Sequence, residues 1–301
     1  MGAQPDDATA TFVTHRNLLF TVAYELLGSA ADAEDVLQET WLRWVKVDLD
    51  TVRDRRAYLV RIAARQALDR LRALGRRRES YVGPWLPEPL LTTPDVAEDV
   101  ELAESVSLAM LLVLETLVPI ERAVFVLREV FDLGYDEIAE AVGRTPAAVR
   151  QLAYRARSHV AARRPRGEVS TARTRAVLAA FQRAVDTGDL RDLLDHLAPD
   201  VVFLGDGGGL ATAAAAPVVG AAAVAALLAV ALPNLAERTV RAAEVNGHPA
   251  LLLSHGGEGG GEVDTVLALR LDDGLITGLY SVRNPDKLSR LGRETPLARL
   301  G

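Results

Sequence analysis

Four side chains in the second half of the sequence are of types that can act as acids or bases: His196, Asp206, His255 and Asp264. In a small-molecule pocket such groups transfer protons to and from a substrate. Their spacing does not single out a pair. His248 and His255 lie seven residues apart without a third ligand, and the H-E-x-x-H pattern of zinc enzymes does not occur. The chain has no cysteine, which excludes disulfides and thiolate chemistry. We expect neither a metal nor a cofactor.

The arginines are distributed in a way that points to a polyanion. The net charge is −7, yet ten arginines lie between residues 53 and 78 against two acids, Asp54 and Asp69. Seven more lie between residues 144 and 166, where no acid occurs. Two basic segments in an acidic chain are typical of two separate contacts with nucleic acid. Solvated arginine-rich helix faces are the alternative that the charges alone leave open.

The second basic segment has the pattern of a helix-turn-helix, over residues 134–160. A first helix is expected to end at Gly143, Thr145 can cap the next helix, and Pro146 suits its first position. The second helix has a predicted buried face of Val149, Leu152, Ala153, Ala156 and Val160. Its outward face and the preceding turn present side chains that can bond bases and phosphates, namely Arg144, Arg150, Gln151, Tyr154, Arg155 and Arg157. This pattern favours a recognition helix in the DNA major groove; an ordinary helical hairpin is the alternative.

A third group of polar side chains lies on a predicted helix over residues 32–44. Its apolar face predicts burial and consists of Ala33, Val36, Leu37, Thr40, Trp41 and Trp44. On the opposite face, at positions i, i+3, i+4 and i+7, lie Asp35, Gln38, Glu39 and Leu42, which we call the docking stripe. A solvated face has little use for a leucine among acids and amides. We interpret the docking stripe as a contact with a protein partner.

The order of these elements, with a linker between the first three helices and the helix-turn-helix, resembles an extracytoplasmic-function (ECF) sigma factor over the first 165 residues. The likeness is closest in DAEDVLQETWLRW, residues 32–44. In that family the corresponding helix of sigma region two docks on the β′ clamp helices of core RNA polymerase. The resemblance implies this role for the docking stripe. It also implies that residues 103–165, as sigma region four, contact the β flap and read the −35 element of promoter DNA.

The basic helix over residues 56–72 resembles the part of sigma region two that melts and reads the −10 element. The residues that this implies are Tyr58, Arg61, Arg65 and Gln66. Their types suit the task, because an opened strand is held by cations and by aromatic or amide groups. Arg65 stands where the family often has asparagine. For Tyr58 a place in the core is the alternative.

Past residue 166 the composition changes. Valine-rich alternating segments, separated by glycine-rich turns, predict antiparallel strands in PDVVFLG, ALLLSH, DTVLALRL and GLITGLYSVR. The segment that begins with TRAVLAAFQRAVDTGDL is similar to a SnoaL-like domain of the nuclear-transport-factor-two-like superfamily. The expected fold is multidomain, with two all-α helical domains followed by an α+β domain.

Three short motifs narrow this resemblance to the ECF subgroup with a fused SnoaL-like extension, often called SigJ-like: WLPEP at 85–89, DGGG at 206–209 and NPDKL at 284–288. Leu210 stands where such members often have a basic residue. We predict that the motifs pack together, so that the extension latches onto the linker and regulates the sigma regions. The residues assigned to this latch are Trp85, Leu86, Pro87, Asp206, Gly207, Gly208, Asn284, Pro285, Asp286 and Lys287.

The expected division of the chain is sigma region two over 8–80, a linker over 81–102, region four over 103–165, the SnoaL-like domain over 168–288 and a flexible tail over 289–301. We expect an ECF sigma factor, not an enzyme, whose partners are core RNA polymerase and promoter DNA and whose last residues restrain its activity. A chain whose extension is a catalytic cyclase, an isomerase or a sensor of a small ligand is the first alternative. A helix-turn-helix activator that never enters the polymerase is the second, and the docking stripe argues against it.

Residues 211–236 carry no charge. Pro217 and Pro233 limit any helix there to about fifteen residues, fewer than the roughly twenty that a membrane span requires. The N-terminus has two acids and no basic residue ahead of an apolar segment, unlike a signal peptide. We expect a soluble, cytoplasmic protein without a membrane partner.

Overall fold

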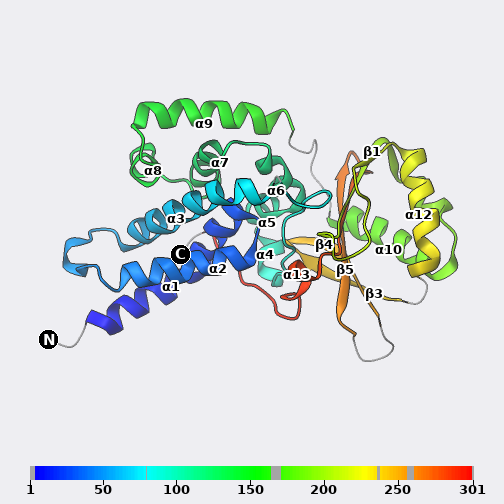
Figure 1. Cartoon of the computed structure of the whole chain (residues 1–301), viewed down its shortest axis with the longest axis horizontal. Helices are drawn as coiled ribbons and strands as arrows, with labels where there is room; N and C mark the ends of the chain where they lie inside the picture. Colours follow the sequence, from blue (N-terminus) through cyan, green and yellow to red (C-terminus); the bar gives the residue numbers. More distant parts are fainter. Residues whose placement is uncertain (1–3, 79, 164–170, 236–237, 256–260, 300–301) are drawn as a thin grey trace.

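The computed structural model describes residues 4–78, 80–163, 171–235, 238–255 and 261–299. The chain is helical in its first half and ends in a sheet flanked by helices (Figure 1). The first helices are α1 (Gln4–Leu27), α2 (Ala30–Trp44) and α3 (Arg55–Arg78), with the short turn η1 (Leu49–Thr51) between the last two. These are the three helices that the sequence predicts.

The boundary between α1 and α2 follows from local signals. Gly28 has a positive φ of 65°, which ends α1 in the left-handed conformation that glycine adopts at little cost. Ser29 then caps α2, its hydroxyl accepting the Asp32 N–H at 3.2 Å. The predicted apolar face is buried except for Trp41, which is half-buried against the core. The Trp44 Nε1 donates to the Ala8 carbonyl at 2.9 Å. Helix α2 is thereby fixed with its other face outward.

Four prolines in residues 81–100 predict an extended linker, but the linker is extended only in part. Its second half forms the short helices α4 (Pro94–Glu98) and α5 (Val100–Val106). Proline at the first helical position costs α4 no hydrogen bond, and the Asp99 side chain caps α5 by accepting the Leu102 N–H at 3.0 Å. The extended half, residues 81–93, contains the WLPEP motif.

The second helical unit contains α6 (Leu108–Glu115), α7 (Pro119–Phe125), the π-helical turn η2 (Val126–Val130), α8 (Tyr135–Val142) and α9 (Pro146–Ala161). The predicted helix-turn-helix is confirmed in α8 and α9. Gly143 ends α8 at a φ of 66°, and the Thr145 hydroxyl accepts the Ala148 N–H at 3.3 Å. The five residues predicted to be buried on α9 are all buried.

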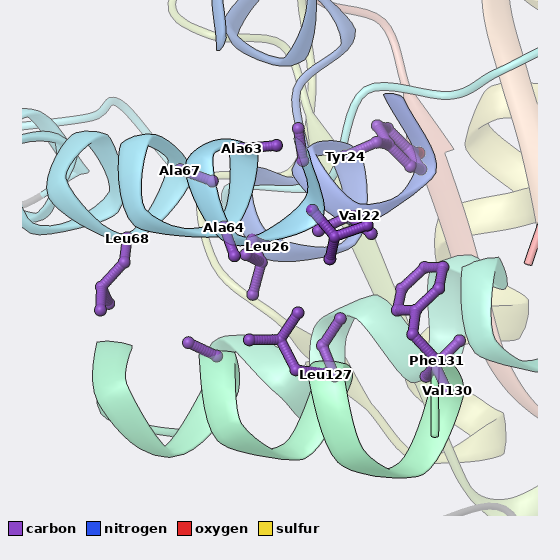
Figure 2. Packing of buried hydrophobic residues seen from close by; sticks show 14 of the residues in the cluster. Val22, Tyr24, Leu26, Ala63, Ala64, Ala67, Leu68, Leu127, Val130 and Phe131 are labelled. Carbon is purple, nitrogen blue, oxygen red and sulfur yellow. The ribbon is translucent and has the colours of Figure 1, made fainter. Parts of the chain in front are cut away.

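One hydrophobic core runs through both helical units. It extends from Ala8 on α1 to Val160 on α9. Figure 2 shows the alanines of α3 lying across from Leu127 and Phe131 of the second unit, with α1 side chains between them. Small side chains let packed helices approach closely. The two units therefore form a single packed body in the free chain.

The last part of the chain is a six-stranded sheet with three helices, α10 (Thr171–Thr187), α11 (Arg191–Leu194) and α12 (Ala221–Leu235). The strand order is β2-β1-β6-β5-β4-β3. The strands are β1 (Leu197–Asp206), β2 (Val218–Val219), β3 (Arg238–Val245), β4 (His248–His255), β5 (Val263–Asp272) and β6 (Leu275–Val282).

The four predicted strands correspond to β1, β4, β5 and β6, but the expected antiparallel sheet is wrong in one pairing. Strand β1 runs parallel to β6, with Phe203 opposite Leu279. Strands β2 and β3 were not predicted. Strand β3 is an edge strand whose sequence, RTVRAAEV, has little hydrophobic alternation, as is common at exposed edges.

The two faces of the sheet are covered by different parts of the molecule. On one face α10 and α12 close a core with residues such as Phe181, Val224 and Leu267. The other face packs against the linker and α6 through a cluster that includes Leu86, Leu108 and Tyr280. Figure 1 shows the sheet between the two helical units and α12. The sheet therefore rests directly on the linker.

The expectation of a flexible tail is wrong for residues 289–299, which we call the strap. After the short helix α13 (Pro285–Leu288), the strap crosses back over the helical units. Thr295 N–H donates to the Leu91 carbonyl at 2.7 Å, and Ala298 N–H donates to the Thr21 hydroxyl at 3.0 Å. Leu297 is buried in the shared helical core. Apolar burial and backbone pairing together outweigh the entropy that a free tail would keep.

Within the described ranges, no helix combines the length and the apolar character that crossing a membrane requires. The same residues contain no group of three or more His, Asp or Glu side chains placed to hold a metal ion.

Candidate polymerase, promoter and interdomain contact sites

The four residues of the docking stripe are exposed together on α2. Leu42 is 58% exposed, and Asp35, Gln38 and Glu39 are exposed beside it. Asp35 accepts a hydrogen bond from Arg70 of α3 at 2.5 Å, and Arg70 also bonds Asp32 at 2.6 Å. The second ion pair anchors Arg70, so α3 orients the acidic end of the stripe without covering its leucine.

The linker caps the helix that carries the docking stripe. The Glu88 carboxylate accepts the Ala30 N–H at 2.8 Å and the Ala31 N–H at 3.3 Å, and the Ser29 hydroxyl lies 3.3 Å away. A carboxylate at a helix N-terminus satisfies free N–H groups and opposes the helix dipole. Burial raises the pKa of Glu88. Glu88 is the acid of WLPEP, and sequence reasoning did not assign it a role.

The residues predicted to read the −10 element are only partly accessible. Arg65 is exposed on α3. Arg61 forms an ion pair with Glu140 of α8 and lies 4.7 Å from the centroid of the Tyr58 ring. Tyr58 is half-buried and lies 5.9 Å from Trp44, between ring centroids. Helix α8 therefore occupies part of the face assigned to the opened strand.

Gln66 departs from its expected place. It is 6% exposed, because it lies three residues after the buried Ala63 and so shares the side of α3 that faces the core. A buried amide does not reach an opened DNA strand while the helices are packed in this way.

The face predicted to read the −35 element is open. Its six residues, Arg144, Arg150, Gln151, Tyr154, Arg155 and Arg157, are all exposed. Arg155 bonds Glu121 at 3.0 Å, and the Arg150 guanidinium lies 5.5 Å from the Tyr135 ring centroid. These contacts hold the arginines over the surface of the second unit. Figure 1 shows α9 at the edge of the molecule, away from the sheet.

The structure brings the three motifs of the predicted latch together around the carboxylate of Asp206. This residue is fully buried. It accepts hydrogen bonds from Tyr81 Oη at 2.5 Å, from the Leu86 N–H at 2.8 Å and from Lys287 Nζ at 2.7 Å. Lys287 also donates to the Leu86 carbonyl. One buried carboxylate thus joins the linker, the end of β1 and α13.

Aromatic rings of the linker complete the latch. Lys287 Nζ lies 4.3 Å from the centroid of the Trp85 ring and 4.9 Å from that of Tyr81, a cation–π arrangement. The Asn284 amide donates to Tyr81 Oη at 2.8 Å. Burial and the Asp206 carboxylate raise the pKa of Tyr81, so its hydroxyl keeps its proton.

Two glycines are required by this packing. Gly208 has a φ of 59°, and a Cβ there would lie 2.3 Å from the Asn284 amide nitrogen. Gly28 has a φ of 65°, and a Cβ there would lie 2.7 Å from the Trp85 ring. Pro285 and Asp286 differ from their predicted place, because their side chains are exposed; Pro87 and Gly207 are buried.

A second polar junction was not predicted from the sequence. The Asn246 side chain donates to Tyr24 Oη at 2.7 Å and to the Val106 carbonyl at 2.8 Å, and it accepts the Leu90 N–H at 2.9 Å. These partners lie on α1, on α5 and in the linker. The signal available in the sequence is the dipeptide Asn246-Gly247, which is typical of a tight turn between two strands; Asn246 has a φ of 54° in the turn between β3 and β4.

Buried charges lie where the two helical units meet. Arg122 of α7 pairs with Glu115 and donates to the Glu25 carbonyl at 2.8 Å. Glu25 accepts a hydrogen bond from Ser105 at 2.9 Å. Burial raises the pKa of Glu25 to about 8 and lowers the pKa of Arg122 to about 9. The junction is therefore sensitive to protonation.

Of the four acid–base types noted in the sequence, His255 and Asp264 come together, with 3.1 Å between Nε2 and Oδ2. Asp206 is engaged in the latch.

Family comparisons agree with the two helical units. The family model described as Sigma-70 region 2 matches residues 11–77, and the one described as Sigma-70, region 4 matches residues 107–160. The fold and the open helix-turn-helix thus define a sigma factor of the sigma-70 class.

Whole-length comparisons place the chain more narrowly. It is 35% identical to the ECF RNA polymerase sigma factor SigJ of Mycobacterium tuberculosis, covering 92% of each chain. It is 33% identical to the probable ECF RNA polymerase sigma factor SigI of the same species, covering 97% of this chain and 98% of that one. The crystal structure of M. tuberculosis SigJ has a TM-score of 0.75 at 33% identity, covering 94% and 98% of the two chains. The chain belongs to the ECF RNA polymerase sigma factors, and within them it is of the SigJ type.

Proposed function

We propose that this ECF sigma factor binds core RNA polymerase through the docking stripe and reads promoter DNA with α9 at the −35 element and α3 at the −10 element. The proposed partner of the docking stripe is the β′ clamp helices. The observation that carries the proposal is the joint exposure of an aliphatic side chain with two acids and an amide on a helix whose other face is fully used in the core.

In the free chain the two helical units are packed together, which we call the closed state, and this arrangement does not suit simultaneous contact with both promoter elements. The −35 and −10 elements are separate segments of promoter DNA, whereas α3, assigned to one, packs directly on α7 and α8 of the unit assigned to the other. Part of the face assigned to the −10 element is not accessible, because Arg61 is paired with Glu140 and Gln66 is buried. We propose that the two helical units separate when polymerase binds.

The SnoaL-like domain regulates this separation in cis. The latch fixes the linker on one side, and the strap adds Leu297 to the core that both helical units share. Because Leu297 packs into a core that both helical units share, the strap stabilises the closed state.

The strap also borders the groove where we propose that the β flap binds. A groove of about 490 Å³ on region four is lined by Met110, Leu114 and Phe125, among others. Arg299 of the strap lies at this groove and pairs with Glu101. Release of the strap would open one side of the groove.

We assign no catalytic role to the SnoaL-like domain. Asp206, the one acid–base candidate that lies in one of the three short motifs, is fully buried and accepts three hydrogen bonds in the latch. A carboxylate held in this way does not exchange protons with a substrate.

The test is promoter-specific run-off transcription with core polymerase, by the full chain, by residues 1–288 and by residues 1–166. Truncation after residue 288 keeps Lys287 and the latch but removes the strap, so residues 1–288 should give more transcript than the full chain. Residues 1–166 lose the latch and should differ from both.

Equal transcription by all three chains would contradict regulation in cis while leaving the sigma assignment intact. Failure of the full chain to direct any specific transcript, with a known sigma factor active in the same assay, would contradict the proposed polymerase and promoter contacts.

A further inference from the structure

Two exposed arginines of α9 occupy different parts of the face assigned to the −35 element. Arg150 lies nearer the middle of that face, and its guanidinium is 5.5 Å from the Tyr135 ring centroid. Arg155 lies at the edge, because Leu152 and Ala156, on the same side of the helix, are buried. In a major groove the middle of a recognition helix faces the bases, whereas its edges face the phosphates of the groove walls.

Glu121 contacts Arg155 from the neighbouring helix. It lies in the first turn of α7, where the helix dipole favours an acid, and its N–H donates to the Val118 carbonyl at 2.9 Å. The Glu121 side chain is 17% exposed, whereas that of Arg155 is 63% exposed. Helices α7 and α9 pack against each other. The carboxylate therefore has a fixed place in the packed unit, and the arginine reaches from it into solvent.

The contact uses one edge of the guanidinium. Arg155 Nε donates to Glu121 Oε1 at 3.0 Å. Within the described ranges, the two Nη groups of Arg155 meet no acceptor. A guanidinium carries five N–H donors in one plane, so a carboxylate at Nε leaves the Nη donors available for a phosphate oxygen. The contact with Glu121 thus fixes the plane of the group and leaves its outer end accessible.

We propose that Glu121 is a positioning residue for promoter binding, which holds Arg155 in the orientation that contacts a phosphate beside the −35 element. This inference rests on the proposed role of α9. An arginine side chain has many rotamers and loses that freedom when DNA fixes it. A side chain that is already held in the binding orientation avoids part of this loss.

The negative charge of Glu121 acts in the opposite direction. An acid close to DNA repels phosphates, so charge alone predicts that removing Glu121 strengthens binding. This repulsion is weak, because Glu121 is paired with Arg155 and because exposed charges are screened beyond about 8 Å at physiological salt. Immobilising one long side chain corresponds to a factor of about two to ten in affinity. Positioning should therefore dominate, and the two effects differ in sign.

The test measures binding of the full chain, without polymerase, to a fluorescent duplex that the parent chain selects from a library randomised over the −35 element. Glu121→Ala should weaken binding about two- to tenfold and reduce the slope of the salt dependence by about one, as loss of a phosphate contact does. Glu121→Gln keeps an oxygen that can accept from Nε and should fall between this variant and the parent. Asp136→Asn removes an exposed acid of α8 and should bind at least as tightly as the parent.

A double-mutant cycle separates positioning from a general defect in the fold. In a chain that carries Arg155→Ala, the further change Glu121→Ala should cause no additional loss, since no guanidinium remains to be positioned. Equal losses in the two backgrounds would overturn the inference, and so would tighter binding by Glu121→Ala than by the parent.

Two other outcomes distinguish this inference from the proposed function. If Arg155→Ala weakens binding and Glu121→Ala does not, the phosphate contact stands and the positioning role is wrong. If the parent chain selects no duplex from the library, the assignment of α9 to the −35 element is wrong, and the role of Glu121 is overturned with it.

Discussion

At the scale of single residues, Asp206 is the centre of the contact between the sheet domain and the linker. Its carboxylate joins three donors that come from two distant segments of the chain. Truncating one partner of a buried ion pair leaves the other charge without compensation, which is far more costly than losing an exposed pair.

We therefore predict that Asp206→Asn destabilises the folded chain by about 3–5 kcal/mol, because Lys287 then remains buried beside neutral groups. Urea unfolding measures this change. Asp286→Asn, two residues from the cap of α13 and exposed, is the matched control and should be near neutral. If the added change Lys287→Met fails to recover part of the loss, the two residues are not coupled.

Glu25 gives a prediction about pH. Its pKa is raised from 4.5 to about 8 by burial, with Ser105 and Arg122 acting in the opposite direction. The folded state thus binds this proton more tightly than the unfolded state does. The associated stability is complete below pH 4.5 and is lost as the pH rises through about 8, by up to about 1.4 kcal/mol per pH unit.

Glu25→Gln should remove this dependence. Between pH 5 and 8 the free energy of unfolding of the variant should fall less than that of the parent chain, because the amide does not ionise. Denaturant unfolding across this range measures the difference, with the exposed Glu39→Gln as control. Parallel pH profiles for all three chains would show that Glu25 does not titrate in this range.

At the scale of elements, α2 and α9 present their assigned residues to solvent while their other faces are buried. Replacing Asp35 and Leu42 together with alanine should weaken binding to core polymerase, since the change removes one charge and one apolar contact from the docking stripe. The measurement is fluorescence anisotropy of the labelled chain titrated with core. Asp50→Ala, an exposed acid outside the stripe, is the control; equal affinity for the double variant and the parent would refute the stripe.

On α9, Arg150→Ala should cost about 1–3 kcal/mol of −35 binding if Arg150 reads a base, and it should relax one position of the element. Arg155→Ala should instead weaken binding to all sequences and reduce its salt dependence, as loss of a phosphate contact does. Competition binding with a −35 library at two salt concentrations distinguishes these results. Arg173→Ala on α10, exposed and far along the chain, should change neither.

How far the sequence predicts each element depends on where the determining interactions lie. The helix-turn-helix follows from local signals, with Gly143 to end one helix and Thr145 to cap the next. Strand β3 was missed because its identity comes from pairing with β4. The burial of Gln66 and the ordered strap depend on packing between segments that are distant in sequence, and no local pattern reports that. The motifs of the latch were found by resemblance, whereas the role of Glu88 in capping α2 required coordinates.

At the scale of the whole molecule, the two helical units share one core, so the proposed promoter contacts require a large change of arrangement. Glu140→Arg should favour the open state, because it places a like charge against Arg61 where an ion pair now lies. The chain contains no cysteine, so spin labels can be placed at Ala73→Cys and Ser158→Cys, which are exposed on α3 and α9.

Double electron–electron resonance should then give a single, short distance between the two spin labels in the free parent chain and a longer distance with core polymerase. Glu140→Arg should raise the fraction of the longer distance in the free chain. Asp136→Arg adds the same charge to the same helix at an exposed position and should leave the distribution unchanged. An unaltered distribution in both variants would contradict a role for this ion pair in closure.

The order in which the ribosome makes these parts gives the strap a further meaning. Region four is complete at about residue 160, whereas Leu297, which fills the core of the helical units, is added about 140 residues later. Domains fold from the N-terminus during synthesis, at about 5–20 residues per second, so this interval lasts roughly 7–28 s. For that time a nascent chain presents folded sigma regions without the strap. In the proposed mechanism, closure by the strap therefore follows the synthesis of both sigma regions, and a chain that stops before Leu297 would be released without this restraint.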